Sequence, residues 1–82
     1  MFYVCIIYSA KIDQYYIGQT SNIEDRLYRH RNSGSKSTKK TSDWELKYTE
    51  TFETRTIAVQ RESEIKKKKS RKYLEFLVSS AG

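Results

Sequence analysis

The 82-residue sequence contains no proline, three glycines, one cysteine and one histidine. Without proline, no helix or strand is interrupted by a residue that lacks a backbone N–H donor. The single cysteine, Cys5, cannot form a disulfide within the chain. One cysteine and one histidine also cannot supply the ligand spacing of a zinc site. We therefore expect a reducing, intracellular compartment and a cytoplasmic protein.

The sequence also lacks a hydrophobic run long enough to span a bilayer. Its apolar opening, FYVCII, is far shorter than the roughly 20 residues that a membrane helix needs. The opening has neither a cationic leader nor a small-residue cleavage site, so it does not resemble a signal peptide. We expect a strand there and no contact with a membrane.

Positive charge is abundant. Sixteen Lys and Arg stand against ten Asp and Glu, which gives a formal net charge of +6. A basic protein attracts polyanions, so nucleic acid is the first candidate partner, and the alternative is a charge that serves only solubility. A chain of this length suits one small domain, and we expect a single domain over residues 1–82.

Hydrophobic periodicity predicts three strands and three helices in the order ββαβαα. The strands are expected at residues 2–9, 15–18 and 44–52, and the first is apolar on both faces, as central strands are. The helices are expected at about 22–32, 54–67 and from Ser70 onward, and Ser21 and Glu24 have the spacing of a capping box. The predicted fold class is α+β, a three-stranded antiparallel sheet flanked by helices.

The third predicted strand has a clear alternation of apolar and polar residues. One parity is apolar and the other is polar, so the apolar set is expected to share one face of the sheet. That set consists of Trp44, Leu46, Tyr48 and Phe52.

Two polar residues fall beside the apolar face of the first predicted helix. At about 100° per residue, Arg26 and His30 lie next to Ile23 and Leu27, whereas Arg29 points away. Arg26 and His30 are therefore candidate functional residues. The alternative is an arginine that reaches solvent along its stem and a half-buried histidine with satisfied hydrogen bonds.

The second predicted helix separates two glutamates. Glu62 shares the face of Ala58 and Ile65, whereas Glu64 lies on the solvent side. A carboxylate on a buried face is costly unless a cation, a metal or hydrogen bonds compensate it. Glu62 is thus a candidate metal ligand, and the alternative is an ion pair with Arg61 or Arg26.

The segment KKKKSRK follows this helix and holds six basic residues among seven. Such a run is often only a solvated surface, but together with the lysines of the 33–43 loop it can frame a groove for phosphates. The residues that we expect to bind nucleic acid are Lys39, Lys40, Lys66, Lys67, Lys69 and Arg71.

These residues resemble the motifs of the small single-domain GIY-YIG nucleases, including the N-terminal nuclease domain of the bacterial excinuclease C subunit. The second signature strand of that family is matched by Tyr16, Ile17 and Gly18, its helical arginine by Arg26, and the histidine four positions later by His30. The family's later glutamate motif, A-x-x-R-E-x-x-I-K, is matched by Ala58, Arg61, Glu62, Ile65 and Lys66. The resemblance extends over essentially the whole chain.

The resemblance implies an endonuclease that hydrolyses DNA phosphodiester bonds with one divalent metal, Mg²⁺ or Mn²⁺. Glu62 would hold the metal, Arg26 would bind the phosphate, His30 would orient it or assist proton transfer, and Tyr16 would position or deprotonate the attacking water. The candidate substrates are nicked, flapped, branched or unspecific DNA, with structured or repair-intermediate DNA among them. RNA remains an alternative, and the protein is a monomer or a homodimer.

The sequence departs from the family at the first signature strand, where Cys5 stands at the usual position of a tyrosine. Tyr8 is near but has the opposite strand parity and cannot replace it. Cys5 is therefore a neutral core substitution, a partial replacement for the tyrosine, or the mark of a catalytically weak or inactive nucleic-acid-binding relative.

Overall fold

The computed structural model describes residues 1–32, 41 and 43–81. It confirms the predicted α+β class and the order ββαβαα. The elements are β1 (Phe2–Ser9), β2 (Gln14–Thr20), α1 (Ile23–Asn32), β3 (Glu45–Phe52), α2 (Arg55–Lys68) and α3 (Arg71–Ala81). None of the helices in the described part of the chain is both long and apolar enough to cross a membrane.

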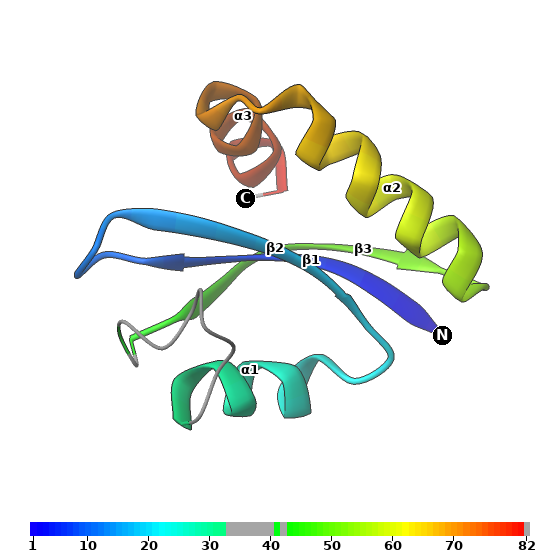
Figure 1. Cartoon of the computed structure of the whole chain (residues 1–82), viewed down its shortest axis with the longest axis horizontal. Coiled ribbons are helices and arrows are strands. Elements are labelled where there is room, and N and C mark those ends of the chain that lie inside the picture. Colours follow the sequence, from blue (N-terminus) through cyan, green and yellow to red (C-terminus); the bar gives the residue numbers. More distant parts are fainter. Residues whose placement is uncertain (33–40, 42, 82) are drawn as a thin grey trace.

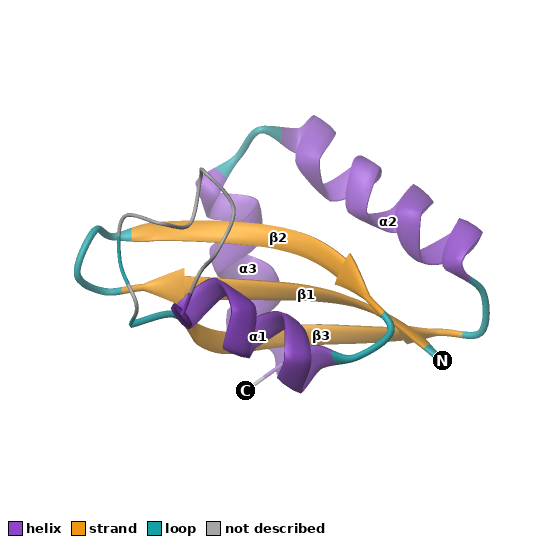
Figure 2. Cartoon of the chain, turned by 60° about the horizontal axis from the view of Figure 1, so that its bottom comes forward, coloured by secondary structure: helices purple, strands orange, loops and turns teal. Residues whose placement is uncertain are grey.

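The three strands form one antiparallel sheet in the order β2-β1-β3, so β1 is central, as its two apolar faces predicted. Figure 1 shows α1 against one face of the sheet and α2 with α3 against the other. In Figure 2, α1 lies in front of the sheet and α3 behind it. The sheet thus separates two layers of helix.

Strand alternation gives the two faces of the sheet different residues. On the α2 and α3 side, the buried core consists of Val4, Ile6, Ile17, Ala58, Ile65 and Leu77. The opposite face, toward α1, receives the residues of the other parity, among them Cys5 and its cross-strand partner Gly18. The main core therefore lies on one face, and the motif residues Tyr16 and Gly18 lie on the other.

Four apolar residues of the third strand were predicted to share one face of the sheet, and this prediction is wrong for Leu46 and Trp44. Tyr48 and Phe52 pack against the core, but a register shift opposite Ile6 and Ile7 pairs Leu46 with Ile7, and Leu46 is 39% exposed. Trp44 precedes the strand and is buried against Tyr16 instead. A β-bulge changes which face the earlier residues reach, and sequence parity does not reveal it.

The helices begin at side-chain caps, one of which differs from the prediction. Asn22, not Ser21, caps α1, because its Oδ1 accepts from the N–H of Asp25 at 3.0 Å. Thr54 caps α2, and Ser70 caps α3 by accepting from the N–H of Tyr73 at 3.2 Å. Each cap satisfies a backbone donor that the first helical turn leaves free.

Candidate active site

The guanidinium of Arg26 lies on the sheet directly over Gly18. A Cβ added to Gly18 would come within 2.3 Å of Arg26 Nη2 and 2.6 Å of Nε. The space left by the missing side chain is therefore the space that the guanidinium fills. Because Gly18 pairs with Cys5 across the strands, the same guanidinium also interacts with the Cys5 thiol.

Arg26 is half-buried, and its Nε is a buried donor without an acceptor among the described residues. Arg29, three residues later, is 73% exposed and pairs with Asp25 at 3.1 Å. The helical periodicity therefore separated the two arginines correctly. A buried guanidinium donor that lacks an acceptor is suited to an anionic ligand, since leaving it unsatisfied is costly.

Cys5 is a buried thiol that is only 4% exposed. Burial raises its pKa above the usual range, while the positive charge of Arg26 opposes the rise and the negative charge of Glu62 adds to it. The thiol is therefore neutral near neutral pH and is not poised to accept a proton. The charges of α1 and α2, which flank opposite faces of the sheet, both act at this residue.

Tyr16 lies in β2, two residues before Gly18, and therefore on the same face of the sheet as Arg26. Its ring meets that of Trp44 edge to face, with centroids 6.5 Å apart. Trp44 was expected in the third strand and not at the site. Its contact with Tyr16 depends on a loop conformation that no periodic pattern describes.

Asp43, the residue before Trp44, is held in place by hydrogen bonds to its own carboxylate. Asp43 accepts from the hydroxyl of Ser9, the hydroxyl of Thr41 and, at 3.0 Å, the backbone N–H of Lys11. The hydrogen bonds from Ser9 and Thr41 lower the pKa of Asp43 to about 2. Asp43 is thus ionised at neutral pH. Its hydrogen bonds connect the segment before β3 to the hairpin formed by β1 and β2. No local pattern in the sequence indicates these hydrogen bonds.

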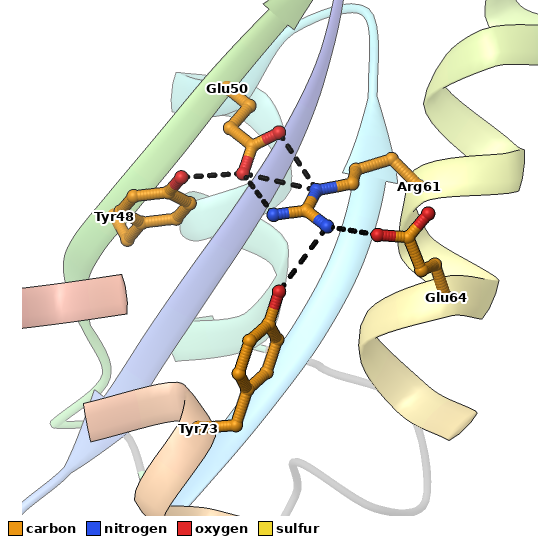
Figure 3. A network of polar contacts seen from close by, with 5 residues as sticks. All are labelled: Tyr48, Glu50, Arg61, Glu64 and Tyr73. Carbon is orange, nitrogen blue, oxygen red and sulfur yellow. Dashed lines mark hydrogen bonds and ion pairs between the residues drawn. The ribbon is translucent and has the colours of Figure 1, made fainter. Parts of the chain in front are cut away.

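Glu62 and Glu64 differ in burial as the helical wheel predicted. The Glu62 side chain is 23% exposed and that of Glu64 is 61% exposed. The cation beside Glu62 is Lys66, whose Nζ lies 2.9 Å from Oε1, one helical turn away. The suggested ion pair with Arg61 is wrong, because Arg61 binds Glu50 and Glu64 (Figure 3).

The described side chains can bind a divalent metal only if most of the metal's ligands come from outside the protein. No group of three His, Cys, Asp or Glu side chains that could enclose a metal occurs in residues 1–29, 41 and 43–80. Glu62 therefore offers a single carboxylate. Mg²⁺ often binds through one or two carboxylates, with waters and substrate phosphates completing its coordination. A lone carboxylate such as that of Glu62 is compatible only with a metal that takes most of its ligands from water and phosphate oxygens.

The predicted nucleic-acid-binding residues have different surroundings. Lys67 and Lys69 are exposed, and Lys66 is paired with Glu62. Arg71 binds the backbone oxygen of Asp13 at 3.0 Å and lies over the ring of Tyr15. Arg71 therefore joins α3 to the hairpin.

Three predicted site residues fall wholly or partly outside the described structure. His30 lies in α1, one turn after Arg26, but its side chain is outside the described residues. Lys39 and Lys40 lie outside them entirely.

Comparison with known proteins agrees with these motifs. A family model described as the GIY-YIG catalytic domain matches residues 1–74, which include Tyr16, Arg26, His30 and Glu62. A UPF0213 protein of Natronomonas pharaonis is 38% identical over 65 residues, which cover 78% of this chain and 75% of the relative. No solved structure matches significantly.

Proposed function

The chain belongs to the GIY-YIG family, a family of nucleases, and we propose that it is an endonuclease that hydrolyses DNA phosphodiester bonds with one divalent metal. The observation that carries this proposal is the position of Arg26. Its buried, unsatisfied Nε lies over Gly18, beside the residue at which the charge of Glu62 also acts. In the proposed complex this cation and the Glu62 carboxylate act on one phosphate.

In this proposal Arg26 binds a non-bridging oxygen of the scissile phosphate. Hydrolysis places additional negative charge on the phosphate oxygens in the transition state, and a preorganised donor stabilises that charge. Arginine suits the task because its planar fork is permanently charged. Gly18 lets the fork rest on the strand, where the sheet fixes its position.

Glu62 would hold the metal, Mg²⁺ or Mn²⁺, through its carboxylate. When bound, the metal supplies Lewis-acid stabilisation of the charge on the phosphate and on the leaving oxygen. Lys66 would have to give up its ion pair with Glu62, and it would then be available to the DNA backbone. An exposed pair of this kind is worth little, so the exchange is not opposed strongly.

Tyr16 positions the attacking water or accepts its proton. It shares the sheet face of Arg26, and the edge of Trp44 holds its ring. Because the pKa of Cys5 is raised, the thiol at the first signature position does not replace a phenolate as a base. His30, one turn after Arg26, orients the phosphate by analogy with the family.

DNA is held by its backbone. The exposed Lys67 and Lys69, with Lys39 and Lys40 of the long loop, contact phosphates in this proposal, which gives salt-sensitive binding without sequence preference. Structured or repair-intermediate DNA is the proposed substrate.

A second function, nucleic-acid binding without cleavage, is favoured by one observation. By the resemblance to the family motif, Cys5 stands where a tyrosine is expected, and its thiol is buried and neutral. If that tyrosine is the required base, the chain binds DNA and does not cut it.

The deciding experiment is a cleavage assay on linear, nicked, flapped and branched DNA. Each substrate is incubated with Mg²⁺, with Mn²⁺ and with EDTA, and purified Glu62→Ala serves as the control for contaminating nucleases. Glu64→Ala is the matched variant on the exposed face. We expect metal-dependent cleavage that Glu62→Ala abolishes and Glu64→Ala retains. Binding without cleavage under both metals would support the second function.

A further inference from the structure

Arg61, the residue before Glu62 in α2, is bound through all of its side-chain nitrogens. Its Nε donates to both oxygens of Glu50, at 3.0 and 3.2 Å, and its Nη2 donates to Glu50 Oε2 at 3.0 Å. Its Nη1 donates to Glu64 and, at 3.4 Å, to the hydroxyl of Tyr73. Figure 3 shows that these contacts join α2 to β3 and α3.

The acceptor on the sheet is itself held in place. The Tyr48 hydroxyl donates to Glu50 Oε2 from the same strand. Burial opposes ionisation of Glu50, but the hydrogen bonds from Arg61 and Tyr48 hold its pKa below the usual range. Both partners of the ion pair are partly buried, with side-chain exposures of 20% for Arg61 and 21% for Glu50. The pair is therefore a fixed contact rather than a transient surface one.

Apolar packing alone defines the rotation of α2 poorly. Its buried residues are Ala58 and Ile65, two turns apart and almost in line along the helix. Ile57 and Val59 are 47% and 44% exposed and add no wide apolar stripe. A helix that rests on so narrow a line can turn about its axis at small cost in buried area.

Arg61 and Glu62 lie on opposite sides of that line. At about 100° per residue from Ala58, Arg61 lies roughly 60° to one side and Glu62 roughly 40° to the other. A rotation that releases Arg61 from Glu50 would therefore move the Glu62 carboxylate as well.

We propose that Arg61 is a positioning residue: by binding Glu50 on β3 it sets the rotation of α2 and thereby directs the Glu62 carboxylate into the active site. The inference rests on the proposed function, in which Glu62 holds the metal. Arg61 itself touches neither metal nor DNA in this arrangement.

Two matched substitutions test the inference. Glu50→Gln and Glu64→Gln each remove one negative charge from the surroundings of Arg61. Only Glu50 belongs to the sheet, whereas Glu64 lies on the same helix and cannot fix its rotation. We expect Glu50→Gln to raise the Mg²⁺ concentration for half-maximal cleavage about tenfold, as loss of an outer-shell partner does, with little change in the Kd for DNA. Glu64→Gln should stay within about twofold of the wild type.

A second readout does not require cleavage. Mn²⁺ broadens NMR signals of nearby nuclei, and the amides of Cys5 and Gly18 are suitable probes because the Glu62 charge acts at Cys5. We expect the broadening to need more Mn²⁺ in Glu50→Gln than in Glu64→Gln. If Glu50→Gln does not fold, Tyr48→Phe removes only the hydroxyl that fixes Glu50, and it should shift the metal requirement in the same direction.

The outcomes separate the two proposals. Cleavage by the wild type with equal metal requirements in Glu50→Gln and Glu64→Gln overturns the positioning role alone. A loss of thermal stability in Glu50→Gln without a change in metal requirement also overturns it, since that is a purely structural effect. A wild type that neither cleaves DNA nor shows broadening by Mn²⁺ overturns the proposed function itself.

Discussion

The guanidinium of Arg26 occupies the space in which a side chain at Gly18 would lie, with Nη2 only 2.3 Å from the position of a Cβ. Two residues eight positions apart, one on a strand and one on a helix, thus form a single feature. The glycine is required here for space rather than for backbone conformation, because its φ lies outside the left-handed region that favours glycine.

Gly18→Ala should impair catalysis more than folding. The added methyl group displaces the guanidinium, which is the flexible end of a long side chain, so the sheet can persist. A displacement of about 1 Å at a reacting group can lower a rate about 100-fold. We expect such a fall in kcat, with a change in Tm of only a few degrees by circular dichroism. Equal losses of stability and activity would contradict this account.

Tyr16→Phe should lower kcat at least about 100-fold if the phenol handles the proton of the attacking water. The ring, and with it the contact with Trp44, is retained in this variant. Tyr15→Phe is the control, since the neighbouring tyrosine packs against the core on the other face of the sheet. Full activity of Tyr16→Phe would assign the proton transfer to another group.

Low pH should weaken the hydrogen bonds that the Asp43 carboxylate accepts. Its pKa is about 2 in the folded protein and near 4 in an unfolded chain, so the contribution to stability is present above about pH 4. That contribution is lost as the pH falls toward 2. We expect the difference in Tm between wild type and Asp43→Asn to shrink between pH 5 and pH 2. A difference that stays constant over this range would show that ionisation of Asp43 does not matter.

Replacing two exposed lysines by glutamate should weaken DNA binding, because their attraction to the phosphates is lost. Each lysine that contacts a phosphate contributes about 1 to the slope of log K against log salt, so Lys67→Glu with Lys69→Glu should reduce the slope by about 2. Lys11→Glu with Lys47→Glu makes the same change in net charge elsewhere on the surface. Fluorescence anisotropy at several salt concentrations measures both pairs. Identical slopes in the two double variants would exclude a local binding surface.

Much of this fold follows from patterns between residues close in sequence. The double-sided apolar pattern of residues 2–9 placed β1 in the centre of the sheet, and the second and third helices begin at Thr54 and Ser70, close to where they were expected. The helical wheel distinguished Glu62 from Glu64 because burial follows the same 3.6-residue period. These features depend on local geometry, which is the same in every helix or strand.

The third strand shows that a local pattern of apolar residues does not always predict which face of the sheet they reach. Leu46 left the predicted face because the pairing of β1 with β3 shifts register, and a register is a property of two strands. Trp44 left it because the residue lies before the strand. No residue within β3 indicates this register shift.

The sequence by itself determined the elements, the family and the candidate residues of the site. Only the tertiary structure decided that Arg26 rests on Gly18, that Arg61 binds Glu50 eleven residues away, that Asp43 binds Ser9 and that Arg71 is held by Asp13. These contacts depend on how helices dock on the sheet and how strands align, because each joins elements whose relative position no local period fixes.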